Sequence, residues 1–130
     1  MDIFFKKVNP NVTVPTYGSA GAAGADLRAC FDDKDTHCDI APSMQVTIPT
    51  GIAVCIPHGM IGLVLACDDL ACKKGLVLAN VGVIPEGYLG EIVVRLSNQS
   101  EYVHRIVNGD RIAQIVFVPY QRGEFVCVEE

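Results

Sequence analysis

Acidic and thiol side chains gather in one short polar segment that follows an apolar run. Cys67, Asp68 and Asp69 are consecutive, and Cys72 comes shortly after them. Thiolates and carboxylates are metal ligands, and a carboxylate is also a common general base for water. The segment therefore indicates a metal site, a hydrolytic site or an exposed acidic turn. Zinc is disfavoured because no second Cys or His pair completes its tetrahedral ligand set, whereas Asp68 and Asp69 with Asp26 would offer oxygen ligands to Mg²⁺.

Asp26 itself follows a run of small residues at 18–25. A run so poor in side chains suits the close approach of the backbone to a ligand or to another chain. Asp26 therefore has two interpretations. It is either a residue of a reactive site or a structural acid that pairs with Arg28 or Arg111.

The elements that must position these residues are predicted to be strands. Short β-branched and aliphatic runs recur about every ten residues, with Gly, Pro or Asn between them, and helical periodicity is almost lacking. This pattern predicts an all-β sandwich or barrel. Residues 1–130 are expected to form one domain, because no linker or internal repeat divides them. The runs are 45–57, 59–67, 75–85, 88–98, 102–110 and 111–120.

The composition limits the classes of partner. Half of the residues (50%) are hydrophobic and the mean hydropathy is +0.33, so part of the apolar surface is expected to meet other subunits. No run reaches the roughly 18 apolar residues of a membrane span. The N-terminus shows no export signal, so the protein is expected to be intracellular, either cytoplasmic or nuclear, with reduced and mostly buried cysteines. The net charge of −5 argues against nucleic-acid binding, which needs a basic face.

Four segments together resemble the trimeric dUTPase family over about residues 14–125: PTYGSAGAAGADLRAC, VTIPTGIAVCIPHGMIGLVLA, GVIPEGYLGEI and GDRIAQIVFVP. They follow the family's order at near-family spacing, which is more specific than any lone motif. The resemblance implies a distorted jelly-roll, or β-clip, barrel that assembles as a homotrimer with active sites between subunits. It also implies hydrolysis of dUTP to dUMP and pyrophosphate, with Mg²⁺ on the phosphates.

The family's first two motifs are matched in part. Its Ala-Gly-x-Asp-Leu motif, which arranges the catalytic water and the metal neighbourhood, is present and includes Asp26. Its Pro-Arg-Ser-x-Leu motif contacts the phosphates, but Cys67 replaces the arginine and Asp68 the serine. A triphosphate would lose a bidentate donor and meet carboxylates that repel it by about 1–4 kcal/mol per pair. We therefore expect a degenerate phosphate site and no resident metal, with Mg²⁺ as cofactor only if hydrolysis persists.

The third motif carries the family's general base and its nucleoside contacts. Pro85 stands where the family has the Asp that activates water, and loss of a base removes about 10²–10⁴ in rate. Asp26 or Glu86 is the alternative base. Adjacent side chains on a strand or turn point in opposite directions, so the Glu86 side chain is expected to face away from the side that Pro85 faces. Tyr88 matches the residue that packs under the deoxyribose, and the main chain at 80–84 matches the hairpin that reads uracil. The fourth motif adds Gln114, so the expected nucleotide-binding residues are Asn80, Gly82, Ile84, Tyr88 and Gln114.

The fourth motif, Gly-Asp-Arg-Ile-Ala-Gln, is intact at 109–114. In the family its Gln reaches the phosphates, which makes Gln114 a ligand contact. Asp110 and Arg111 are expected to form a turn and an intersubunit contact. The fifth motif is a glycine-rich arm with Arg and Phe that closes over the nucleotide. It is absent from residues 1–130, so the γ-phosphate is expected to lack its clamp.

Three parts of the family's machinery thus differ: the phosphate-binding arginine, the general base and the arm. The sequence therefore favours a dUTPase-fold protein that has lost dUTP hydrolysis and serves in binding or regulation. Its partner would be an unidentified protein, as in virus-borne proteins of this fold, which raises the suspicion of a viral origin. Two alternatives stay open. One is an active or altered dUTP diphosphatase, and the other is a sensor that binds a deoxyuridine nucleotide without cleaving it.

Overall fold

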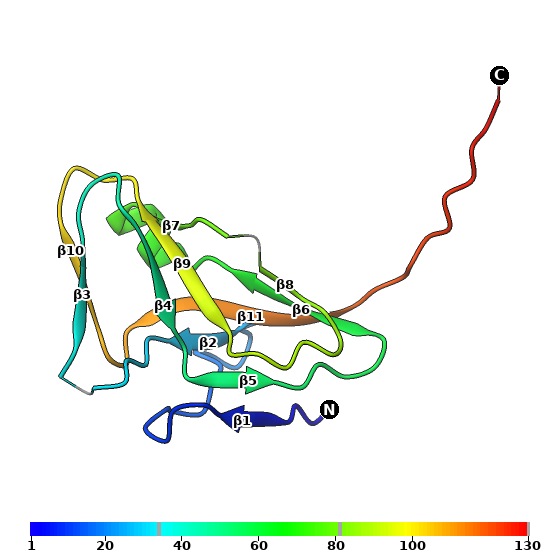
Figure 1. Ribbon diagram of the computed structural model, residues 1–130, viewed down its shortest axis with the longest axis horizontal. Coiled ribbons are helices and arrows are strands. Elements are labelled where there is room, and N and C mark those ends of the chain that lie inside the picture. Colours follow the sequence, from blue (N-terminus) through cyan, green and yellow to red (C-terminus); the bar gives the residue numbers. More distant parts are fainter. Residues whose placement is uncertain (34, 81, 130) are drawn as a thin grey trace.

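The computed structural model describes residues 1–33, 35–80 and 82–129, and strands dominate it (Figure 1). The all-β prediction is confirmed, and the one helical element of these residues, η1, is a short π-helical turn. In chain order the elements are β1 (Phe5–Lys7), β2 (Ala25–Arg28), β3 (His37–Ile40), β4 (Gln45–Pro49), β5 (Ile52–Val54), β6 (Met60–Leu65), η1 (Asp69–Lys74), β7 (Leu76–Leu78), β8 (Gly82–Ile84), β9 (Val93–Asn98), β10 (His104–Val107) and β11 (Arg111–Pro119).

The strand β11 is the centre of an antiparallel sheet with the order β2-β11-β6-β8. Its residue Gln114 lies opposite Asp26 of β2 on one side and opposite Leu65 of β6 on the other. The chain leaves β6 at Leu65, so the polar segment after it emerges beside Gln114. The register of this sheet therefore brings together three motifs that are far apart in the sequence.

The other strands form a three-stranded sheet, β4-β9-β7, and two separate pairs, β1-β5 and β3-β10. Figure 1 shows the β3-β10 pair at one end of the molecule and β1 beside β5 along its lower edge. The alternation of β9 explains its place: Val93 and Arg95 face solvent, while Val94 and Leu96 are buried.

One aliphatic core connects the two larger sheets. Leu27 and Ile115 of the four-stranded sheet and Ile48 and Leu96 of the three-stranded sheet are at most 2% exposed and belong to one cluster. Burial of each such side chain is worth about 1.5–3 kcal/mol. The polar segment after β6 is thus attached to a rigid sheet on which its geometry depends.

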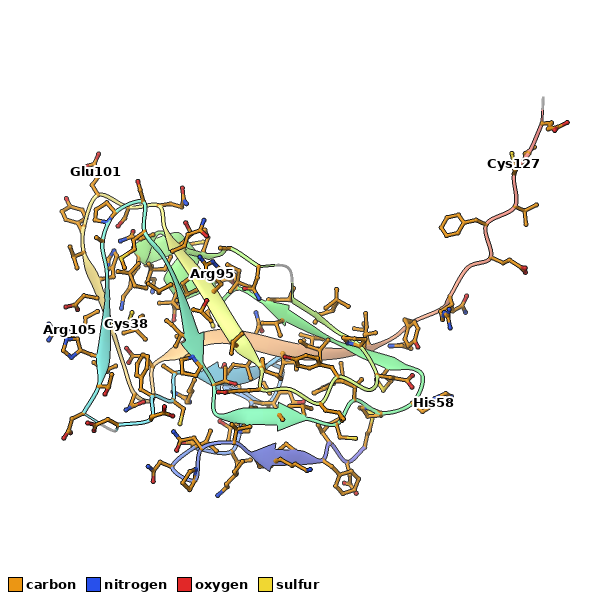
Figure 2. The ribbon with its side chains drawn as sticks, viewed as in Figure 1. Cys38, His58, Arg95, Glu101, Arg105 and Cys127 are labelled. Atoms are coloured by element: carbon orange, nitrogen blue, oxygen red, sulfur yellow. The ribbon has the colours of Figure 1, made fainter. Side chains whose placement is uncertain are left out.

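All six cysteines are free thiols. The expectation that most of them are buried is wrong, because three of the six are exposed. Figure 2 shows one of these, Cys127, on the extended C-terminal segment. The C-terminal segment leads away from the body of the molecule, and its side chains Phe125 and Val128 are exposed. No helix among the described residues is long and apolar enough to cross a membrane. The buried thiols are Cys30 and Cys67, Cys38 is half-buried, and the exposed thiols are Cys55, Cys72 and Cys127.

Candidate active site

A polar hollow of about 190 Å³ opens where β2 and β11 meet the segment that follows β6. Asp26 from β2 and Gln114 from β11 line it, as the register of the sheet requires. Four residues that the sequence assigned to the phosphate side therefore do come together. The lining consists of Asp26, Cys67, Asp68, Asp69, Arg111 and Gln114.

Gln114 and Gly24 form the inner part of this site. The Nε2 of Gln114 donates a hydrogen bond to the Ala66 carbonyl at 3.0 Å, which ties β11 to the segment after β6. A Cβ atom on Gly24 would lie 2.9 Å from the Cβ of Gln114, closer than carbon atoms pack. The small residue at Gly24 thus makes room for the Gln114 side chain of the same chain. The expectation was that this run makes room for a ligand or for another chain.

Asp26 lies between the two arginines that were predicted as its structural partners. Its side chain is 10% exposed, and its two oxygens lie 3.8 Å from Arg28 Nη2 and 3.8 Å from Arg111 Nη1. Both predicted structural partners are therefore present. Because 3.8 Å is longer than a hydrogen bond, the carboxylate keeps lone pairs for a water molecule in the hollow.

Arg111 extends from β11 into the hollow. Its Nη2 donates a hydrogen bond to Asp69 Oδ2 at 2.7 Å, and Lys73 Nζ lies 3.5 Å from Asp69 Oδ1. A second hollow of about 340 Å³ adjoins the first, because Cys67, Asp69 and Arg111 line both. The sequence assigned Arg111 to an intersubunit contact, but within its own chain this side chain supplies positive charge to the predicted phosphate side.

Cys67 is a buried thiol at the junction of the two hollows. Burial raises its pKa above the ordinary value, although the nearby Arg111 acts in the opposite direction. The thiol therefore stays protonated near neutral pH and is a poor nucleophile and a poor metal ligand. Within 1–33, 35–80 and 82–129, no three Cys, His, Asp or Glu side chains are placed to hold a metal ion.

Pro85 begins a tight turn that ends at Tyr88. The Tyr88 N–H donates to the Pro85 carbonyl at 3.3 Å, and Gly87 has a φ of 81°. Glu86 leaves this turn toward another loop, where its carboxylate accepts a hydrogen bond from the Gly59 N–H and lies 3.1 Å from His58 Nδ1. Glu86 thus points away from the polar hollow, in agreement with the expectation from sequence. Figure 2 shows His58 at the end of the molecule opposite to Arg105.

Tyr88 lies in a different environment. Its Oη donates to the Glu91 carbonyl at 3.0 Å, and its ring is 40% exposed. The ring lines an apolar hollow of about 330 Å³ together with Phe4 and Leu89. This hollow shares no residue with the hollow of Asp26.

The remaining predicted nucleoside residues lie on or before β8. Gly82 and Ile84 pair with Val64 and Gly62 of β6, so their main chain is part of the four-stranded sheet. The Asn80 side chain accepts a hydrogen bond from the Arg95 N–H at 3.0 Å. Val81 of the predicted uracil-reading main chain lies outside the described residues. One copy of the chain therefore does not bring its nucleoside and phosphate residues into one cavity among the described residues.

The sequence and the fold identify the family of this chain. A family model described as dUTPase matches residues 10–130. The chain therefore belongs to the dUTPase family.

Individual relatives agree with this assignment. The deoxyuridine 5'-triphosphate nucleotidohydrolase of Desulfitobacterium hafniense is 46% identical over 119 residues, which are 90% of this chain and 77% of the relative. The protein of the same name from Citrobacter koseri is 40% identical over 126 residues, 95% of this chain and 81% of the relative. The Staphylococcus bacteriophage 80alpha dUTPase, solved with dUpNHpp, has a TM-score of 0.84 at 26% identity and covers 99% of this chain and 89% of its own. The predicted dUTPase-like fold is confirmed.

These relatives contradict the hypothesis that the chain has lost dUTP hydrolysis and serves in binding or regulation, because proteins 40–46% identical to it are named as dUTP hydrolases. The hypothesis treated each departure from a motif as a lost charge. In space, however, the Arg111 guanidinium lies in the hollow that Cys67 lines, and Asp26 supplies a carboxylate there. The two relatives are bacterial, so the suspicion of a viral protein is not supported either.

Sequence reasoning named Asp69 and Arg111 separately and did not predict that Arg111 and Lys73 both face the Asp69 carboxylate. The motif at 109–114 marks Arg111, but only the register of β11 shows which way its side chain extends. The signal in the sequence that could have pointed to these cations was the neutral thiol at Cys67. A neutral residue at the position of a family arginine calls for a replacement cation, and Arg111 and Lys73 were both available in the sequence.

Proposed function

We propose that this chain hydrolyses dUTP to dUMP and pyrophosphate. The observation that carries the proposal is the polar hollow in which Asp26, Arg111 and Gln114 meet, in a chain of the dUTPase family. In this reaction a water oxygen bonds to the α-phosphorus, and the bond from that phosphorus to the bridging oxygen breaks. The pyrophosphate leaves with the bridging oxygen, and a base takes the proton of the water.

Asp26 is the carboxylate that we assign to the water. It lines the hollow, and its oxygens are not committed to short hydrogen bonds. Pro85 has no proton acceptor in its side chain, and Glu86 is held by Gly59 and His58 away from the hollow. Asp26 therefore orients the water and accepts its proton, while Gln114 holds the adjoining segment in place.

Mg²⁺ fits this hollow as a partner of the substrate's phosphates. Asp26 and Asp68 offer carboxylate oxygens, the ligands that Mg²⁺ prefers, but the described residues alone do not form a three-ligand metal site. These two side chains would hold the ion together with the triphosphate. When bound, the ion neutralises phosphate charge and so offsets the repulsion from the carboxylates.

The functional unit in this proposal is a homotrimer of one dUTPase-like domain, residues 1–130. Two observations support it. The Tyr88 hollow and the Asp26 hollow share no residue, so a complete site needs residues from two copies. In addition, large apolar side chains such as Phe4, Leu89 and Phe125 are exposed in a single copy. Contact between copies would cover them and place Tyr88, with the main chain at Gly82 and Ile84, beside the deoxyuridine of a neighbouring site.

The test is a measurement of pyrophosphate release from dUTP with Mg²⁺ by the full chain, with dCTP and dTTP for comparison. We expect turnover of dUTP above about 0.1 per second, within two decades of a median enzyme. Asp26→Asn is expected to lower the rate by about 10²–10⁴ through loss of the base. Asp35→Asn, an identical change at an exposed remote residue, is expected to leave the rate within twofold.

Slower turnover of dUTP than about 0.1 per second would contradict the proposal. Calorimetric titration with dUMP then separates the two remaining cases. Binding of dUMP without hydrolysis of dUTP would identify a nucleotide sensor. A rate that Asp26→Asn and Asp35→Asn change equally would show that Asp26 is not the base.

A further inference from the structure

The carboxylate of Asp69 is held between two cations. Arg111 Nη2 donates to one oxygen at 2.7 Å, and Lys73 Nζ lies 3.5 Å from the other. A guanidinium and an ammonium that face two oxygens of one anion make the same contacts that they would make with a phosphate. Asp69 therefore occupies a place that is chemically suited to a phosphate group.

The surroundings of this ion pair provide the space that a phosphate chain needs. The hollows of about 190 Å³ and about 340 Å³ meet at Asp69 and Arg111. The larger one is also lined by Lys73 and Lys74, so positive charge continues beyond the ion pair. The neutral Cys67 thiol lines both hollows and contributes no charge to either.

We propose that Arg111 and Lys73 are the phosphate-binding cations of this chain and that Asp69 is an internal competitor, which the incoming phosphates displace. The inference rests on the proposed function for the identity of the substrate, but its central claim concerns phosphate binding alone. The positive charge that the family motif would place at Cys67 comes instead from β11 and η1. The loss of the family's arginine at Cys67 and the presence of a carboxylate at Asp69 are then two parts of one change in how the site binds phosphate.

The exchange is physically easy because the ion pair is at the surface. The side chain of Asp69 is 58% exposed and that of Arg111 39%. An exposed ion pair is weak and screened by salt. A phosphate carries more negative charge than a carboxylate and, like a carboxylate, can accept two N–H groups of a guanidinium, so it replaces Asp69, which then rotates into solvent.

The test uses inorganic pyrophosphate as the probe and calorimetric titration of the full chain at low ionic strength. Asp69→Asn removes the competitor and is expected to tighten pyrophosphate binding about fivefold. Arg111→Gln removes a charged donor and is expected to weaken it at least about tenfold, and Lys73→Gln about threefold. The gain from Asp69→Asn is expected to shrink toward onefold at about 1 M salt.

Asp68→Asn is the matched comparison. Asp68 precedes Asp69 and lines the smaller hollow, but it makes no ion pair with any residue that the structure describes. In a titration without Mg²⁺, its replacement removes the same charge and is expected to tighten binding by no more than about twofold. Equal gains from Asp68→Asn and Asp69→Asn would overturn the competitor role, because they would show an effect of net charge only.

The remaining outcomes are also decisive. Unchanged pyrophosphate affinity in both Arg111→Gln and Lys73→Gln would overturn the assignment of the cations. If Arg111→Gln does not fold, unchanged affinity in Lys73→Gln alone would overturn it. No binding of pyrophosphate at millimolar concentration by any variant would overturn the whole inference. A chain that fails to hydrolyse dUTP but shows the expected order of affinities would refute the proposed function and support the phosphate site.

Discussion

Glu86 shows how a single carboxylate can serve structure at a position next to a family's catalytic residue. It accepts a hydrogen bond from the Gly59 N–H, contacts His58 Nδ1 at 3.1 Å and lies 3.3 Å from Tyr120 Oη. The hydrogen bond from Gly59 is the main reason that the pKa of Glu86 is below its ordinary value. Glu86 therefore joins the turn at 85–88 to the loop before β6 and to the end of β11.

We expect Glu86→Gln to change how stability depends on pH. A carboxylate whose pKa is lower in the folded than in the unfolded chain stabilises the fold above the unfolded pKa of about 4.3, and this contribution is lost as pH falls through the folded pKa. Thermal unfolding from pH 7 to pH 3 should therefore show a lower Tm for Glu86→Gln at pH 7 and a difference that vanishes in acid. Glu101→Gln, at an exposed residue, is the control. A difference that is the same at every pH would refute the role of the charge.

At the level of elements, the turn from Pro85 to Tyr88 has the strictest local requirement. Gly87 has a φ of 81°, in the left-handed region, and a Cβ atom there would meet nothing within 4 Å. The requirement is therefore one of backbone conformation alone, without crowding. This turn sets the position of Tyr88, whose ring lines the apolar hollow.

Gly87→Ala should destabilise the chain by about 1 kcal/mol, because a left-handed backbone is strained for a residue with a Cβ. Gly87→Asn should destabilise it less, since Asn tolerates that conformation. The free energy of unfolding in urea measures both. The order would be reversed or absent if side-chain crowding, not backbone strain, governed this position.

The molecule as a whole leaves its predicted functional residues divided between separate hollows. It also leaves exposed a set of apolar side chains on either side of β1, on the loop after Tyr88 and on the C-terminal segment. Figure 1 shows that this last segment extends away from the body of the molecule. Soluble monomers rarely expose large contiguous apolar patches. Both features are accounted for if copies of the chain pack against one another.

We expect sedimentation equilibrium to give a mass three times that of the 14.0 kDa chain at micromolar concentration. Phe125→Asp should weaken the assembly if the C-terminal segment packs on a neighbouring copy, because it places a charge in an apolar contact. Glu124→Asp, which keeps the charge beside it, is the control. A monomer at all concentrations would contradict the proposed trimer.

Much of the fold could be predicted from local patterns. The run at 111–120 became β11 and the run at 59–67 contains β6, because long β-branched and aliphatic runs bury well only in a sheet. The run at 75–85 was predicted as one segment but contains two strands, which pair with different partners, β7 with β9 and β8 with β6. The π-helical turn η1 was not predicted, because its six residues are too few to show a helical period between the surrounding strands.

The sequence by itself determined the strand-rich architecture, the family and the chemical types at Asp26, Cys67, Asp68, Pro85 and Gln114. Only the tertiary structure decided which charged groups lie close together, because electrostatic interaction depends on distance in space and not on position in a motif. The register of β2, β11 and β6 brought Arg111 to within 2.7 Å of Asp69 beside a position that had lost its arginine. The same packing turned Glu86 toward Gly59 and placed Asp26 in the hollow beside Arg111 and Gln114.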